Sequence, residues 1–281
     1  MTMPKTWLIT GSSRGFGRSL AEAALAAGHR VVATARSAEA LQDLAERYGD
    51  RALIRALDVT DPASARAAVA AAVDAFGTLD VVVNNAGYCT VSSIEDTTDE
   101  DFSGQVGTNL VGVFNVTRAA LPVFRKQRSG HFLQMSSVGA RFGAPGISAY
   151  QATKWGVNGF SEALAKEVAP FGVKVTIVEP GAFRTDFAGP SLTVPPVRPE
   201  YDDTVGALGR TLQGNAGKEP GDPAAAAAVL LQVIAAEDPP LHLLLGEDAV
   251  AIAEAADSAR RENDRKWRHL SVSTGFADAA P

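Results

Sequence analysis

A tyrosine and a lysine four positions apart, Tyr150 and Lys154, are the residues of this sequence whose types and spacing most directly suggest chemistry. Residues i and i+4 of a helix lie on the same face, so the two side chains can point into one pocket. The ordinary pKa of a phenol is about 10, and a nearby ammonium group favours the phenolate. The pair therefore predicts a general acid or base. Taken alone, it is also compatible with a surface pair on an amphipathic helix.

Two further polar residues have types suited to the same reaction. Ser137 follows an apolar segment, at the end of a predicted strand, and its hydroxyl could hold a carbonyl or alkoxide oxygen. Its neighbour Ser136 offers the alternative, a serine that only bonds to nearby backbone. Asn109 lies in a predicted helix, for which asparagine is a poor former. It could carry a water that links Lys154 to solvent, or be an ordinary polar helix residue.

A glycine-rich segment near the N-terminus predicts a nucleotide site. Gly11, Gly15 and Gly17 follow a short apolar segment and open a helical pattern. In this strand–helix context the first glycine allows a tight turn, and the later ones let the backbone approach a pyrophosphate at the positive end of the helix dipole. The alternative is a plain turn between a strand and a helix. A dinucleotide and a proton-transfer pair together predict an oxidoreductase.

The charges beside this segment favour one dinucleotide. Sites for NAD(H) place a carboxylate after the second strand, to bind the ribose hydroxyls. This chain has Arg36 there, and Arg14 lies within the glycine-rich segment. Two guanidinium groups can bind a 2′-phosphate bidentately, which favours NADP(H) over NAD(H). The alternative is two solvated arginines.

Short apolar segments alternate with longer amphipathic ones, which predicts repeated strand–helix units around a parallel sheet covered on both faces. The predicted strands are residues 5–10, 30–35, 52–57, 80–84, 130–136, 173–179 and 241–245. The predicted helices are residues 15–27, 38–48, 62–76, 99–128, 149–169, 222–236 and 248–270. We expect one domain over residues 1–281. The Pro- and Gly-rich segment 182–221 breaks the pattern, which predicts a lid or a disordered loop. We expect residues 272–281 to form a tail or an oligomer contact.

The composition narrows the class of protein. With 46% hydrophobic residues the chain can bury a full core, and its net charge of −6 argues against nucleic-acid or anionic membrane partners. Cys89 is the single cysteine, which suits a reducing compartment, and the four histidines form no metal-binding pattern. Apolar runs stay short of membrane-spanning length, and a strand begins almost at the N-terminus, leaving no room for a signal peptide. We expect a cytoplasmic protein with no metal.

Several motifs occur here in one order. They are Thr10-Gly11-x-x-x-Gly15-x-Gly17, Asn84-Asn85-Ala86-Gly87, Asn109, Ser137, Tyr150-x-x-x-Lys154 and Pro180-Gly181. This set, spread over roughly residues 5–186, resembles the short-chain dehydrogenase/reductase family in its compact single-domain branch. The resemblance implies an α/β fold with a Rossmann-type, doubly wound, parallel seven-stranded sheet in the order 3-2-1-4-5-6-7.

The resemblance also implies roles for the catalytic residues. Tyr150 would be the general acid or base, and Ser137 would position the substrate oxygen. Lys154 would lower the pKa of Tyr150 and hold the nicotinamide ribose, and Asn109 would anchor a proton-relay water. The catalytic set shows no departure from the family pattern.

For the cofactor, the resemblance implies an adenine contact at Asp58, a cleft floor at Asn85, Ala86 and Gly87, and a carboxamide contact at Thr185. The full predicted set of cofactor residues is Gly11, Ser13, Arg14, Gly15, Phe16, Gly17, Arg36, Asp58, Val59, Asn85, Ala86, Gly87, Tyr150, Lys154, Pro180, Gly181, Phe183 and Thr185.

The expected activity is that of an NADP(H)-dependent carbonyl reductase or alcohol dehydrogenase. Its substrate is expected to be a hydrophobic ketone or secondary alcohol, because the candidate pocket residues are mostly apolar. These candidates are Phe142, Ile147, Phe183, Phe187 and Leu192. The family resemblance suggests a homodimer or homotetramer joined through the helices at 99–128 and 149–169. The alternatives are a redox-neutral isomerase or dehydratase on the same fold, and an NADP(H)-sensing regulator, for which a damaged catalytic set is expected.

Overall fold

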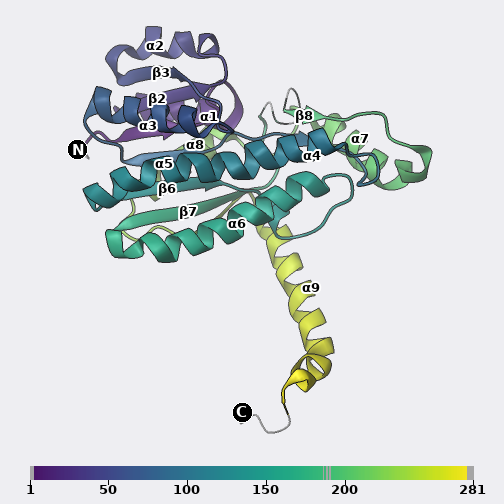
Figure 1. Ribbon diagram of the computed structural model, residues 1–281. Helices are drawn as coiled ribbons and strands as arrows, with labels where there is room; N and C mark the ends of the chain where they lie inside the picture. The colour runs from purple at the N-terminus through teal and green to yellow at the C-terminus, as the bar shows by residue number, and fades with distance from the viewer. Residues whose placement is uncertain (1–2, 186, 188, 190, 277–281) are drawn as a thin grey trace.

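A seven-stranded parallel sheet forms the centre of the computed structural model, which describes residues 3–185, 187, 189 and 191–276 (Figure 1). Its strands are β1 (Thr6–Ile9), β2 (Arg30–Ala35), β3 (Ala52–Ala56), β4 (Val81–Asn84), β6 (Gly130–Met135), β7 (Val173–Pro180) and β9 (His242–Leu245). They lie in the order β3-β2-β1-β4-β6-β7-β9. Counted along the chain, these seven strands follow the expected order 3-2-1-4-5-6-7, so the predicted doubly wound sheet is confirmed.

Helices cover both faces of this sheet. One layer contains α1 (Gly15–Ala26), α2 (Gln42–Tyr48) and α8 (Pro223–Ala235), and the other contains α3 (Pro62–Phe76), α5 (Gly112–Gln127) and α6 (Ser148–Val168). Alternate residues of a strand point to opposite faces, so Trp7 and Ile9 of β1 enter the first layer and Leu8 the second. Helices cover both faces, which is why the central strands β1, β2 and β4 consist mostly of buried apolar residues.

Capping residues fix the beginnings of two of these helices. The Asp61 side chain accepts hydrogen bonds from the N–H groups of Ala63 and Ser64, ahead of Pro62 at the first helical position of α3. Asp222 caps α8 in the same way, through the N–H group of Ala224. In both cases an aspartate followed by proline marks the helix start.

The helix expected over residues 99–128 has three parts. These are α4 (Asp99–Val106), a π-helical turn over Gly107–Val111, and α5. Two short strands that the sequence did not predict, β5 (Cys89–Thr90) and β8 (Leu192–Thr193), form a small parallel pair of their own. The segment 182–221, expected to be irregular, also contains α7 (Ala207–Asn215). Two-residue strands are too short to show any periodicity, so pattern analysis does not find them.

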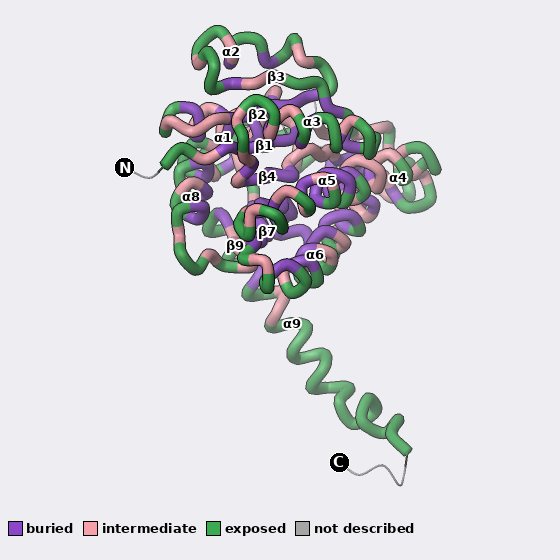
Figure 2. Tube along the Cα trace, turned by 60° about the vertical axis from the view of Figure 1, so that its left-hand side comes forward, coloured by how far each residue is buried: buried purple, intermediate pink, exposed green. Residues whose placement is uncertain are grey.

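The last helix, α9 (Glu247–Ser271), leaves the body of the protein. Its buried residues, Ala249 and Ala253, lie in the first two turns. The helix then projects outward, and its residues from 258 onward are exposed (Figures 1 and 2). None of the helices among the described residues is long and apolar enough to cross a membrane.

Candidate active site

A cleft of about 720 Å³ lies at the carboxyl ends of the central strands. This size suits a small-molecule or cofactor site. Many of the predicted cofactor residues line it, namely Gly11, Ser13, Arg14, Gly15, Phe16, Arg36, Asp58, Val59, Asn85, Ala86, Gly87 and Thr185. Further lining residues that the sequence did not single out are Ala35, Leu57, Thr60, Ser103, Gly104, Gly107, Thr108, Ser191 and Thr193.

The glycine turn between β1 and α1 needs its glycines for two different reasons. Gly11 and Gly15 have φ angles of 68° and 56°, in the left-handed region that favours glycine. Gly17 instead meets a close approach of backbone, because a Cβ there would lie 2.4 Å from the Gly11 carbonyl oxygen. Asn85 fixes the turn to the end of β4: its Nδ2 donates to the carbonyl oxygens of Thr10 (2.9 Å) and Gly11 (3.1 Å).

Basic and acidic side chains lie at the outer part of the cleft. Arg14 and Arg36 are both exposed, and Nε of Arg14 donates to Oγ of Ser191 at 3.2 Å. Oδ1 of Asp58 accepts hydrogen bonds from the N–H (2.9 Å) and hydroxyl (2.7 Å) groups of Thr60. These bonds lower the pKa of Asp58, and the charge of Arg36 lowers it further.

Six predicted cofactor residues lie outside the cleft lining that the described residues form, namely Gly17, Tyr150, Lys154, Pro180, Gly181 and Phe183. Pro180 ends β7, and the next residue, Gly181, packs so closely on α9 that a Cβ would lie 2.3 Å from the Asp248 carboxylate. The ring of Phe183 packs against Phe16, with the ring centroids 4.9 Å apart. It therefore supports Phe16 from behind the cleft.

Ser137 and Tyr150 are brought together at the inner end of the site. Ser137 caps the short 3₁₀ turn Val138–Ala140, and its Oγ accepts a hydrogen bond from the Gly139 N–H at 3.0 Å. Burial raises the pKa of Tyr150 well above its ordinary value, while a hydrogen bond with Ser137 acts in the opposite direction. The ring of Phe187, which lines the cleft, lies 5.7 Å from the Tyr150 ring.

Lys154 lies beside Tyr150, as the spacing predicted. Its side chain is buried, Nζ lies 5.5 Å from the centroid of the Tyr150 ring, and Nζ donates to the Met135 carbonyl oxygen at 2.7 Å. Burial lowers the pKa of Lys154 to about 8. The sequence predicted that the ammonium group would lower the pKa of Tyr150. In this structure desolvation is the larger effect on both groups, so the phenol is the weaker acid and the amine the weaker base.

Asn109 occupies the π-helical turn between α4 and α5. Such turns occur often at functional sites, since they turn side chains out of the regular helical positions. Nδ2 of Asn109 donates to Oγ1 of Thr153, on α6, at 3.3 Å. A Cβ added at Gly87 would lie 3.1 Å from Oδ1 of Asn109 and 3.7 Å from Nζ of Lys154. Gly87, which lines the cleft, therefore adjoins both side chains.

Cys89 is buried below this site, and burial raises the pKa of its thiol to about 12. It is therefore an uncharged, small buried side chain near neutral pH. In the described part of the chain, no group of three or more His, Cys, Asp or Glu side chains is arranged to hold a metal ion.

Comparison with known proteins identifies the family. Residues 5–193 match the family described as short chain dehydrogenase. This chain belongs to that family. The short-chain dehydrogenases are oxidoreductases that bind a nicotinamide cofactor and act on CH–OH or C=O groups.

Other members of the short-chain dehydrogenase family match most of the chain. "Oxidoreductase BOA17" of Botryotinia fuckeliana is 49% identical, over 97% of this chain and 100% of its own length. A 3-ketodihydrosphingosine reductase of Bacteroides thetaiotaomicron is 35% identical, over 86% of this chain and 88% of its own. The crystal structure of a short-chain dehydrogenase from Streptomyces avermitilis superposes with a TM-score of 0.92 at 42% identity, covering 98% of this chain and 100% of its own.

Solved structures of similar fold hold either cofactor. A serine dehydrogenase complexed with NADP+ has a TM-score of 0.74 and 27% identity, over 85% of this chain and 94% of its own. A Burkholderia phymatum enzyme in complex with NAD has a TM-score of 0.80, over 99% of this chain and 98% of its own. Its identity of 22% shows the shared fold alone.

Proposed function

We propose that this protein is an NADP(H)-dependent carbonyl reductase or alcohol dehydrogenase, acting on a hydrophobic ketone or secondary alcohol. The observation that carries the proposal is the convergence of Ser137, Tyr150 and Lys154 next to the cleft. Family membership sets the reaction class, and this convergence supplies the groups that the reaction needs.

The cleft residues fit a dinucleotide. The absence of a side chain at Gly17 lets the glycine turn pack closely, because a Cβ there would collide with the backbone of Gly11. Among the described residues no side chain caps the first-turn N–H groups of α1. Free N–H groups at a helix N-terminus suit a pyrophosphate. Asp58 and Val59 lie where the adenine contact is proposed, and Thr185 lines the cleft as the proposed carboxamide contact.

The preference for NADP(H) is supported by the charges at the cleft. Arg14 and Arg36 both line it, and the second strand ends in Ala35 without a carboxylate. Asp58 is an acidic residue of the cleft lining, but its Oδ1 already accepts hydrogen bonds from the N–H and hydroxyl groups of Thr60. Two exposed guanidinium groups suit a 2′-phosphate better than a ribose diol.

In the proposed reaction the protein handles a proton and orients the substrate. When bound, the nicotinamide supplies or accepts the hydride. In reduction, the Tyr150 hydroxyl gives its proton to the substrate oxygen while Ser137 donates a hydrogen bond to the same atom. Nζ of Lys154 lies 5.5 Å from the centroid of the Tyr150 ring. Its proposed role is to supply positive charge beside the phenol, because a nearby ammonium group favours the phenolate. Asn109, beside Gly87 and Lys154, is the proposed anchor of the water that returns the proton.

A hydrophobic substrate fits the residues around Tyr150. Phe187 lies against the Tyr150 ring, and Val91 and Val205 pack around Gly146. The Bacteroides relative is by its name a reductase of 3-ketodihydrosphingosine. We propose that residues 182–221, which carry Phe187 and α7, form the lid of the substrate pocket within a single 281-residue domain.

We also propose that the protein is a cytoplasmic homodimer or homotetramer. Val111 at the end of the π-helical turn, Phe114 of α5 and Trp155 of α6 are exposed to solvent, each more than 40% accessible. Apolar side chains gathered on neighbouring helices are typical of an interface. The projecting part of α9 offers a second contact region (Figure 2).

The test follows NADPH absorbance with a panel of ketones, diketones, quinones and aldehydes. We expect turnover with at least one apolar carbonyl compound, and a loss of about 10²–10⁴-fold in kcat for Tyr150→Phe. Tyr48→Phe, at the end of α2 and outside the cleft, is the matched control and should be unchanged. Cofactor binding without turnover would contradict the proposal, and turnover without net cofactor change would favour the isomerase or dehydratase alternative.

A further inference from the structure

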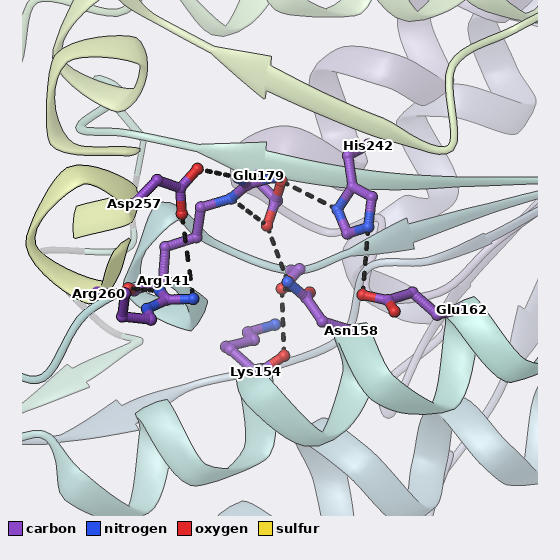
Figure 3. Close-up of polar contacts among 9 residues, drawn as sticks. Arg141, Lys154, Asn158, Glu162, Glu179, His242, Asp257 and Arg260 are labelled. Atoms are coloured by element: carbon purple, nitrogen blue, oxygen red, sulfur yellow. Dashed lines mark hydrogen bonds and ion pairs between the residues drawn. The ribbon is translucent and has the colours of Figure 1, made fainter. Parts of the chain in front are cut away.

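Glu179 is a fully buried carboxylate near the end of β7, with a complete set of donors (Figure 3). Arg141 binds it bidentately: Nε lies 3.0 Å from Oε1 and a terminal guanidinium nitrogen lies 2.6 Å from Oε2. Asn158 donates to Oε1 at 2.8 Å, and Nδ1 of His242 lies 3.3 Å from Oε2. Because the Arg141 guanidinium and the Asn158 side-chain amide donate to both carboxylate oxygens, the buried carboxylate keeps one fixed orientation.

The segment that carries Ser137 is held by this carboxylate at both ends. On the carboxyl-terminal side, Arg141 binds Glu179 directly. On the amino-terminal side, the Ser136 hydroxyl donates to Oδ1 of Asn158 at 2.6 Å, and the Asn158 amide donates to Glu179. One carboxylate therefore sets the position of the whole turn from residue 136 to residue 141.

The same carboxylate also holds the helix that carries the other catalytic groups. Tyr150, Lys154 and Asn158 are spaced by four residues along α6, so they lie on one face of the helix. The hydrogen bond from Asn158 to Glu179 therefore fixes the position of this face of α6 relative to β7. The two elements whose side chains must meet are joined through one buried group.

The first turns of α9 close this network from outside. Arg260 donates to the Arg141 carbonyl oxygen, and its guanidinium lies 5.0 Å from the centroid of the Trp155 ring, next to Lys154 in the sequence. Asp257 lies 3.5 Å from a terminal nitrogen of Arg141. The guanidinium of Arg141 therefore lies between the Glu179 and Asp257 carboxylates, while Arg260 holds the Arg141 backbone (Figure 3).

We propose that Glu179, together with Arg141, is a positioning pair that holds the Ser137 hydroxyl against the Tyr150 phenol during proton transfer. The proposal rests on the proposed function of those two residues. Glu179 lies outside the lining of the described cleft, so it acts through the Ser137 segment and α6. A buried ion pair is a weak source of net stability, since desolvation offsets its Coulomb attraction, but it imposes a defined geometry.

The test is a double-mutant cycle of Glu179→Gln and Ser137→Ala, measured as kcat with NADPH and the best substrate of the panel. In the wild-type background we expect Glu179→Gln to lower kcat by about 10- to 100-fold, because a small misplacement of reacting groups is costly. In the Ser137→Ala background it should cost less than about threefold, because the hydroxyl that it positions is already gone. The KM for NADPH should change little.

A pH profile separates positioning from a general loss of stability. The hydrogen bond from Ser137 lowers the pKa of Tyr150, and the titratable groups beside Tyr150 among the described residues are Lys154 and Cys89. Glu179→Gln and Ser137→Ala should therefore both move the rising limb of alcohol oxidation to higher pH. Merely weakened folding would leave that limb in place.

Glu162→Gln is the matched control. Glu162 lies 3.3 Å from Nε2 of the same His242, and among the described residues it makes no hydrogen bond to the Ser137 segment. We expect unchanged kcat and an unchanged pH profile. Where Glu179→Gln fails to fold, Arg141→Lys replaces it in the cycle, because it keeps the charge and loses the bidentate fork.

The outcomes distinguish the two proposals. Additive losses in the cycle, with an active wild type and an impaired Ser137→Ala, would overturn the positioning role alone. An active wild type that tolerates Ser137→Ala would overturn both the proposed role of Ser137 and the positioning pair. A wild type that binds NADPH and turns over nothing would overturn the proposed function and this inference with it. Non-additive losses with the shifted pH limb would establish the pair.

Discussion

Asn109 pairs with both backbone groups of Tyr88. Its Oδ1 accepts the Tyr88 N–H at 3.0 Å, and its Nδ2 donates to the Tyr88 carbonyl oxygen at 2.8 Å. Asn109 is fully buried, so these bonds form away from water. Tyr88 follows Gly87 in the loop after β4, and both residues line the cleft. A side chain from the π-helical turn thus fixes the loop that forms one wall of the site.

We expect Asn109→Ala to lower the free energy of unfolding by about 1–3 kcal/mol, since it leaves buried backbone groups of Tyr88 without partners. If Asn109 also anchors the relay water, kcat should fall by about tenfold or more. Urea unfolding and steady-state kinetics measure the two effects separately. Full stability of the alanine variant would contradict a role in holding the loop.

A second prediction concerns Gly17. In Gly17→Ala the new Cβ would lie 2.4 Å from the Gly11 carbonyl oxygen and 2.5 Å from Nδ2 of Asn85. Backbone must move to relieve this overlap, at a cost of about 1–3 kcal/mol in stability. Because the movement opens the glycine turn, we also expect weaker NADPH binding, measured by fluorescence titration.

The control for this variant is Gly214→Ala, in α7. No described heavy atom lies within 4 Å of its added Cβ. Alanine is the better helix former, so stability should be equal or higher and NADPH affinity unchanged. Equal affinities for Gly17→Ala and the wild type would show that the turn does not bind the cofactor.

The third prediction concerns the pH dependence of stability that Lys154 contributes. Burial lowers its pKa from 10.5 to about 8, so between these values the unfolded state binds more protons than the folded state. Stability therefore rises with pH across that window. We expect the free energy of unfolding of the wild type to rise relative to Lys154→Met from about pH 8 to 10.5, with a constant difference below it. Urea titrations at a series of pH values measure it.

Subtraction of the Lys154→Met values removes the opposing contributions of its neighbours. Burial raises the pKa of both Cys89 and Tyr150, so in the folded state each keeps its proton to a higher pH than when unfolded. Both residues thus destabilise the fold as pH rises above their ordinary pKa values. If the difference in free energy of unfolding between wild type and Lys154→Met did not change between about pH 8 and 10.5, the lowered pKa of Lys154 would be contradicted.

The sheet could be predicted from the sequence because most strand residues are apolar, on both faces of the central strands. Leu8 and Ile9 enter different layers and are equally buried, so burial leaves a continuous apolar run in the sequence. The spacing of Tyr150 and Lys154 was equally informative, because the helix repeat alone places them on one face.

Other features depend on contacts between distant residues, which the sequence pattern does not reveal. The pairing of Cys89 with Leu192 in the small sheet joins segments far apart in the chain, and each strand has only two residues. The π-helical turn at Asn109 changes one backbone register inside an otherwise helical sequence. Arg141 and Glu179 are 38 residues apart, and either would pass for an ordinary polar residue at the end of an element. Phe183 follows a cofactor motif, yet its ring packs behind Phe16.

The last prediction tests which cofactor the cleft selects. In Arg36→Ala we expect the KM for NADPH to rise by about 10- to 100-fold, because a hydrogen bond between charged groups contributes about 1.5–3 kcal/mol. NADH lacks the 2′-phosphate, so kcat/KM with NADH should change by less than about twofold. Arg55→Ala removes an exposed arginine of β3 that lies outside the lining formed by the described residues, and should leave both cofactors unaffected. Equal losses with NADPH and NADH would show that Arg36 does not recognise the phosphate.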